Sequence, residues 1–92
     1  MTVGLYYTVK SGREEEFEAY FGRVKEHLAS VQGHVATRLY RDVEESNSYL
    51  IYSEWETRED FERFRAGDAF KAAKEWGRDS ILARPPRHTV FG

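Results

Sequence analysis

The stretch "YLIYSEWETREDFERFRAGDAFKAAKEW", residues 49–76, decides the fold because a strand pattern changes within it to a helix pattern. Residues 48–55 are rich in β-branched and aromatic side chains, which predicts a strand. Thr57 and Asp60 then form a capping-box pattern, which predicts the start of a helix. The aromatic side chains of this stretch either fill a core or line a cavity for a flat ligand.

Two short helical segments are expected after this strand. The first carries Phe61 and Phe64, and Gly67 is expected to end it. Asp68 is expected to cap the second. After two prolines, residues 87–91 ("RHTVF") predict a short last strand.

The N-terminal part of the chain predicts one strand and one helix. Residues 2–9 are β-branched and aromatic and predict the strand. Ser11 and Glu14 form a capping box, and apolar residues recur at three- and four-residue spacing over 17–31, which predicts the helix. Gly33 is expected to end that helix in a left-handed conformation.

A further strand over 34–43, with Val35, Leu39 and Val43 on one face, completes the order βαββαβ. Right-handed crossovers then place both helical segments on the same face of one antiparallel sheet. We therefore expect an α+β, ferredoxin-like fold, as a single domain over residues 1–92.

Both faces of the expected sheet carry apolar side chains. One face offers Val3, Leu5, Tyr7, Ile51 and Trp55, and the other offers Tyr6, Tyr40, Leu50 and Tyr52. The helices cover only one face, and the other carries too much aromatic surface to leave in water. We expect a homodimer packed sheet to sheet through the Tyr6, Tyr40, Leu50 and Tyr52 face, as an eight-stranded α+β barrel. The alternative is a monomer whose tyrosines stay exposed.

Composition excludes several classes of function. The net charge is −2 with both signs interspersed, so the basic stripe of a nucleic-acid-binding protein is absent from the sequence. No apolar run approaches membrane-spanning length, and the N-terminus lacks a signal-peptide pattern, so we expect a cytoplasmic protein without a membrane partner. The absence of cysteine excludes disulfides and thiolate metal sites.

The segment "SEWETREDFERFRAGDAFKAAK" resembles the signature of the antibiotic biosynthesis monooxygenase family, a set of dimeric α+β barrel proteins. The family pattern of a strand ending in Trp, an aromatic pair three residues apart and a following Phe is matched by Trp55, Phe61, Phe64 and Phe70. Upstream, "SVQGHVATRLYR" is similar to the family's second strand, with His34 where Phe is usual. The resemblance implies the fold more directly than the substrate, because this fold carries several chemistries.

The resemblance implies one of two kinds of oxygenase. One kind oxidises aromatic polyketide intermediates with O₂ and no cofactor, using the substrate carbanion as the electron source. Its Trp is matched by Trp55, but an Asn four residues earlier is replaced by Ile51. The other kind binds and degrades haem through an Asn, a Trp and a His, and these positions fall on Leu5, Phe64 and Lys74.

We therefore expect a small-molecule monooxygenase that oxidises a hydrophobic quinol-like or phenol-like aromatic substrate without a bound cofactor. Two alternatives stay open: a non-catalytic dimer that binds a small apolar ligand, and a haem-handling monooxygenase with altered ligation. The expected substrate-binding residues between sheet and helices are Trp55, Phe64, Phe70, Tyr49, Ile51 and Leu5.

Tyr7 and His27 are the candidate catalytic residues. Tyr7 has the strand parity to face the helices, where its hydroxyl can bind a substrate oxygen or transfer a proton. His27 borders the helix–sheet seam and is a candidate general base, although a lone His off the apolar centre is more often a solvated or structural side chain. Trp55 is favoured as a binding residue because a buried indole N–H needs a partner, which a ligand can supply. No histidines have metal-ligand spacing, so no metal site is expected.

Overall fold

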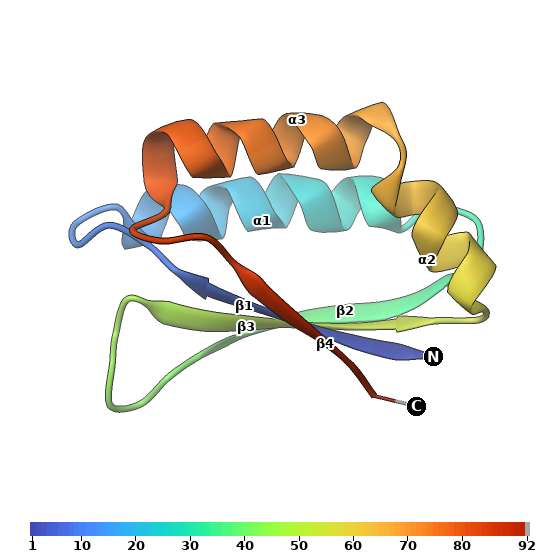
Figure 1. The fold of residues 1–92 in the computed structure, drawn as a ribbon, viewed down its shortest axis with the longest axis horizontal. Helices are drawn as coiled ribbons and strands as arrows, with labels where there is room; N and C mark the ends of the chain where they lie inside the picture. Colours follow the sequence, from blue (N-terminus) through green and yellow to red (C-terminus); the bar gives the residue numbers. More distant parts are fainter. Residues whose placement is uncertain (92) are drawn as a thin grey trace.

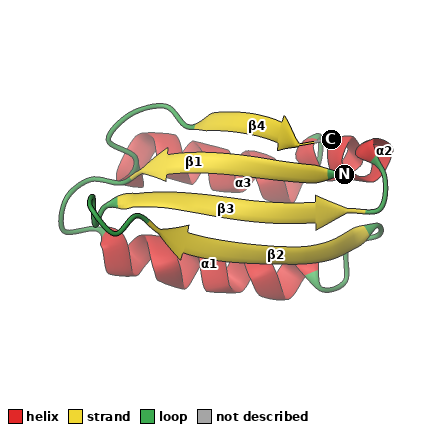
Figure 2. Ribbon diagram, turned by 90° about the horizontal axis from the view of Figure 1, so that it is seen from below, coloured by secondary structure: helices red, strands yellow, loops and turns green. Residues whose placement is uncertain are grey.

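The computed structural model describes residues 1–91, so Gly92, the last residue of the predicted domain, lies outside the described part. Its elements in chain order are β1 (Thr2–Thr8), α1 (Glu14–Leu28), β2 (His34–Arg41), β3 (Ser48–Trp55), α2 (Arg58–Arg65), α3 (Asp68–Trp76), the π-helical turn η1 (Gly77–Ile81) and β4 (Arg87–Phe91). The strands form an antiparallel sheet in the order β2-β3-β1-β4 (Figure 2). The helices lie on one face of this sheet (Figure 1), which confirms the predicted ferredoxin-like α+β fold.

The strand register confirms the two predicted faces. Leu5 lies opposite Ile51 in the β1–β3 pair, on the face that the helices cover. On the other face, which we call the outer face, Leu50 lies opposite Tyr6 on one side and Tyr40 on the other. Strand parity therefore separates the side chains that meet the helices from those that do not.

The core divides into two clusters of buried side chains. The first consists of Val3, Leu28, Trp55 and Phe61, and the second of Val9, Phe17, Tyr49 and Ile81. Helix α3 contributes no buried residue to either cluster, although it lies in the helical layer. The helical layer is therefore well packed through α1 and α2 and loosely packed under α3. Within residues 1–91, no helix combines the length and the apolar character that crossing a bilayer requires.

Two predicted boundaries of the first helix are wrong. The residue that caps α1 is Arg13, without a side-chain hydrogen bond, rather than Ser11. Gly12 has a φ of 89°, which turns the chain just before the helix, and the acidic residues of the first turn favour the positive helix end instead. Helix α1 ends at Leu28, so Gly33 does not terminate it. Gly33 does have a positive φ, 82°, but it uses that conformation to enter β2.

Of the two predicted caps after β3, the one at Thr57 is confirmed and the one at Asp68 is wrong. Thr57 caps α2 and accepts a hydrogen bond from the Asp60 backbone N–H at 3.1 Å, as expected. Asp68 does not cap α3, because the cap residue is Gly67 in an extended conformation and Asp68 is already helical.

The second strand is shorter than predicted and irregular at its start. It ends at Arg41, and Val43 lies in the following loop with its side chain fully exposed. The register shifts between His34 and Ala36, so Val35 does not share a face with Leu39. Such a bulge reorients one side chain, and Val35 is 55% exposed.

Candidate functional site

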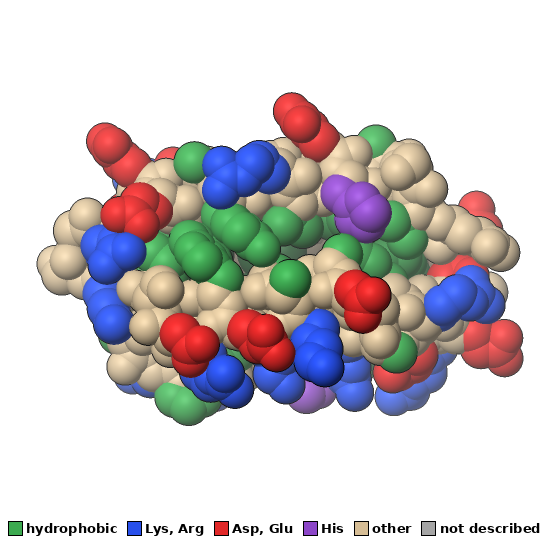
Figure 3. Space-filling model, turned by 90° about the horizontal axis from the view of Figure 1, so that it is seen from above, with side chains coloured by type: hydrophobic (Ala, Val, Ile, Leu, Met, Phe, Trp, Pro, Cys, Tyr) green, Lys and Arg blue, Asp and Glu red, His purple; other side chains and the backbone are tan. Residues whose placement is uncertain are grey.

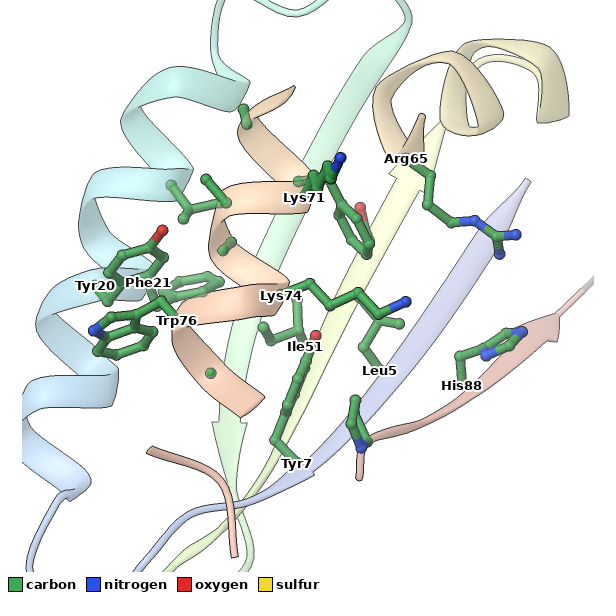
Figure 4. Close-up of a pocket in the computed structure, with 18 of the residues that line it drawn as sticks. Leu5, Tyr7, Tyr20, Phe21, Ile51, Arg65, Lys71, Lys74, Trp76 and His88 are labelled. Carbon is green, nitrogen blue, oxygen red and sulfur yellow. The ribbon is translucent and has the colours of Figure 1, made fainter. Parts of the chain in front are cut away.

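A cavity of about 1140 Å³ lies between the helical layer and the sheet, where α3 is loosely packed. Leu5, Tyr7 and Ile51 of β1 and β3 form its floor (Figure 4). The space-filling view from the helical side shows apolar side chains gathered in a depression, with charged side chains at its margins (Figure 3). A cavity of this size and apolar character suits a small organic ligand.

Aromatic rings form two walls of the cavity. On one side, Phe64 packs against Trp55 with ring centroids 5.3 Å apart and meets Phe70 edge-on at 5.8 Å. On the other side, Tyr20 of α1 stacks on Trp76 of α3 at 4.1 Å, with the ring planes 9° apart. Rings in these arrangements offer flat faces and edges, which favour a planar aromatic ligand.

The structure brings seven of the eight predicted site residues to this cavity: Leu5, Tyr7, His27, Ile51, Trp55, Phe64 and Phe70. Tyr49 is the exception, because its ring is buried in the second core cluster against Phe17, at 4.8 Å. The Tyr49 hydroxyl donates to Glu18 at 2.6 Å, and burial, followed by the Glu18 contact, raises the pKa of Tyr49 to about 12. Tyr49 thus ties β3 to α1.

The partner of the Trp55 indole is Ser53, so the sequence argument for a ligand partner does not hold. The indole N–H donates to Ser53 Oγ at 2.7 Å. Ser53 Oγ lies 3.1 Å from Thr37 Oγ1, which in turn lies 2.6 Å from His34 Nε2. Burial lowers the pKa of His34. We call these four side chains the polar chain.

Ser53 and Thr37 also line the cavity, although neither is among the residues predicted from the sequence. A signal was present: Ser53 is two residues before Trp55 and therefore shares its face of β3. Thr37 lies directly opposite Ser53 in the β2–β3 pair. The bulge that shifts this register is not visible in the spacing, so the pairing could not be found from the sequence.

Tyr7 is the candidate catalytic residue that reaches the cavity from the floor (Figure 4). Burial raises the pKa of Tyr7 to about 12, because the phenolate would be poorly solvated. At neutral pH Tyr7 is therefore a neutral phenol, which donates a hydrogen bond rather than accepting a proton. His27 is exposed on α1 and reaches the cavity only at its margin.

The positions that the family resemblance assigns to haem ligation do not carry the side chains that such ligation uses. The resemblance assigns the ligating His to the position of Lys74, whose side chain is not an imidazole. Leu5, at the position of the Asn, has no hydrogen-bonding group. The imidazoles that do line the cavity, His27 and His88, are both exposed at its margins. Across residues 1–91, no three His, Cys, Asp or Glu side chains gather as a metal site.

Comparison with known proteins identifies relatives over 98% of the chain. The model of the antibiotic biosynthesis monooxygenase family matches residues 1–76. A protein of Haloquadratum walsbyi named "Putative heme-binding protein" is 41% identical over 90 residues, which cover 98% of this chain and 17% of the relative. A similar protein of Natronomonas pharaonis with the same description is 38% identical over 98% of this chain and 15% of its own length. The chain thus spans less than a fifth of these curated relatives.

Solved structures share the fold. The oxygenase SnoaB of Streptomyces nogalater, described as cofactor-independent, superimposes with a TM-score of 0.84 at 27% identity, covering 99% of this chain and 89% of that chain. A conserved protein of Methanosarcina mazei superimposes with a TM-score of 0.89 at 17% identity, covering 98% of this chain and 88% of that chain. The second likeness shows the fold alone.

Proposed function

Because the chain belongs to the antibiotic biosynthesis monooxygenase family, we propose that it oxidises a flat, hydrophobic phenol-like or quinol-like compound with O₂ and no bound cofactor. The observation that carries this proposal is the aromatic-walled cavity with the Tyr7 hydroxyl at its floor. The description of SnoaB as a cofactor-independent oxygenase supports the same chemistry.

The proposed reaction is illustrated by anthrone, a flat tricyclic ketone with an acidic methylene group. A base removes one methylene proton, and the resulting carbanion gives two electrons to O₂ as the new C–O bond forms. Protonation gives a hydroperoxide, and loss of water leaves anthraquinone, so one O₂ yields one carbonyl oxygen and one water. Tyr7 would donate a hydrogen bond to the anthrone oxygen and stabilise the negative charge that develops there. His27 is the proposed proton acceptor at the cavity margin.

Oxygen uptake with anthrone tests this proposal. Ala73 lines the cavity on α3, so Ala73→Trp should fill the space and lower the rate by about tenfold or more. Ala19→Trp is the matched control, because Ala19 is exposed on α1 and does not line the cavity. Equal rates in the two variants, or no uptake above the uncatalysed rate, would contradict the proposal. Saturable anthrone binding without uptake would favour the non-catalytic ligand-binding alternative.

Haem handling is the second candidate function, favoured by the names of the haloarchaeal relatives and by His27 and His88 at the cavity margin. Haemin titration followed at the Soret band separates it from the first. We expect weak binding that neither His27→Ala nor His88→Ala changes, because the position that the family resemblance assigns to the ligating His holds Lys74. A stoichiometric complex abolished by either variant would favour the haem alternative.

The outer face supports a homodimer. Tyr40 is 50% exposed there, and Phe91 is 48% exposed. The paired strands leave this face without helical cover (Figure 2). A second copy packed on it would remove this aromatic surface from water.

A further inference from the structure

The charged residues around the cavity all have one sign. Seven Lys and Arg residues line it: Arg23, Arg65, Lys71, Lys74, Arg78, Arg84 and Arg87. Within residues 1–91, no Asp or Glu lines it, although the chain contains 16 acidic and 14 basic residues. A cleft with low-dielectric walls and charges of one sign concentrates the field and attracts ligands of the opposite charge.

Not all of these cations are available to a ligand. Arg78 pairs with Asp79 at 3.0 Å, and Arg84 pairs with Glu45 at 3.5 Å. The Arg87 guanidinium lies 5.8 Å from the centroid of the Tyr6 ring, on the outer face. Arg78 and Arg84 are therefore partly neutralised by their ion pairs, and the Arg87 charge points away from the cavity. All three contribute less positive charge to a ligand in the cavity.

Four cations remain. Arg23 of α1 lies over the Tyr20 ring, with its guanidinium carbon 5.3 Å from the ring centroid, and the other three come from α2 and α3. Lys71 and Lys74 of α3 have no ion-pair partner within residues 1–91, and Arg65 has only a long contact of 3.8 Å to Glu62. His88 of β4 adds a ring nitrogen beside Leu5, its partner across the β1–β4 pair. Figure 4 shows Arg65, Lys74 and His88 reaching the side of the cavity that β1 and β4 border. We call Arg65, Lys74 and His88 the basic margin.

We propose that the natural ligand is an aromatic carboxylate, whose ring enters the aromatic-walled cavity while its carboxylate pairs with the basic margin. This inference deepens the proposed function and rests on it. A carboxylate conjugated to a ring lies in the ring plane, so it fits a slot whose walls favour planar groups. Arg and Lys form charge-assisted hydrogen bonds with carboxylates, which are about twice as strong as neutral ones.

Isothermal titration with 2-naphthoate and its uncharged amide, 2-naphthamide, tests the proposal, because the two probes share the ring and differ in charge. We expect naphthoate to bind about tenfold more tightly than naphthamide at about 50 mM NaCl. Lys74→Gln and Arg65→Gln should each weaken naphthoate binding more than naphthamide binding and so reduce this preference. Raising the salt to about 500 mM should also reduce it, because salt screens exposed charges.

Lys25→Gln is the matched control, because it removes the same charge from an exposed position of α1 that does not line the cavity. Equal binding of the two probes would overturn this inference and leave the proposed function standing. A naphthoate preference that Lys74→Gln, Arg65→Gln and Lys25→Gln all leave unchanged would also overturn it. If neither probe bound, the aromatic-ligand function would fail together with the inference.

Discussion

At the scale of single residues, the buried Trp55 indole N–H has the Ser53 hydroxyl as its hydrogen-bond acceptor in the polar chain. Ser53→Ala would leave the Trp55 N–H without its acceptor inside the first core cluster. A buried unpaired donor costs about 1–3 kcal/mol, so the free energy of unfolding in urea should fall by that amount. Ser46→Ala is the control, because Ser46 is exposed in the β2–β3 loop and such changes stay within about 0.5 kcal/mol. Equal effects of the two changes would show that Trp55 has another partner.

Tyr7 allows a second test at this scale, because its hydroxyl is proposed to donate and not to act as a base. Its pKa, raised by burial to about 12, keeps the proton in place at neutral pH. Tyr7→Phe should lower kcat/KM for anthrone by about tenfold, the loss of one hydrogen bond, without changing the shape of the pH profile. Tyr40→Phe, on the outer face, should change neither quantity. A titrating limb that disappears in Tyr7→Phe would make Tyr7 the base and contradict the proposal.

At the scale of elements, Glu18 joins helix α1 to two strands. Its carboxylate accepts from the Tyr49 hydroxyl of β3 at 2.6 Å and from the Arg41 guanidinium of β2 at 2.5 Å. The Tyr49 hydrogen bond, followed by the Arg41 contact, lowers the pKa of Glu18. A carboxyl whose pKa is lower in the folded state stabilises the protein above its unfolded pKa, and this stability is lost as the pH falls through the folded pKa.

The expected contribution of Glu18 is therefore present at neutral pH and disappears in acid, below the ordinary range of glutamate. The Glu18 side chain is 38% exposed, so solvent screens the contribution and keeps it small. Glu18→Gln should lower Tm at about pH 7, and the difference from the wild type should shrink towards about pH 3. Glu15→Gln, an exposed change in the same helix, serves as the control. A Tm difference that grew in acid would contradict the assignment.

Elements with strong local patterns could be predicted from the sequence, and elements fixed by distant contacts could not. Residues 48–55 and 87–91 alternate or carry β-branched residues, and both strands have the predicted bounds. The start of α1 differs from the prediction because the Ser11–Glu14 pattern is also compatible with the turn that Gly12 makes. The bulge after His34 depends on how β2 meets β3, and hydrophobic spacing within one strand does not contain that information.

At the scale of the whole molecule, strand parity predicted which side chains face the helices, and seven of the predicted site residues do meet in one cavity. The basic margin could not be predicted in this way. Its members come from α2, α3 and β4, and their convergence depends on the position of α3, which packs little against the sheet. Lys74 in particular has the spacing of a solvated flank, and only the three-dimensional arrangement relates it to Arg65 and His88.

The outer face gives the last prediction, which concerns the assembly. Gly4 leaves room there for the Phe91 ring, since a Cβ at Gly4 would lie 2.9 Å from it, so β4 extends the apolar surface around Leu50. A stable interface buries about 800 Å² of each partner, and a sheet face can supply that area.

We expect light scattering at micromolar concentration to give twice the mass of one chain. Leu50→Asp combined with Tyr52→Asp should dissociate or unfold the protein, because it would bury unpaired charges. Ala19→Asp is the control, because Ala19 is exposed on α1, in the helical layer on the other side of the sheet (Figure 1). Circular dichroism separates dissociation from unfolding, and a monomer mass for the wild type would rule out the dimer.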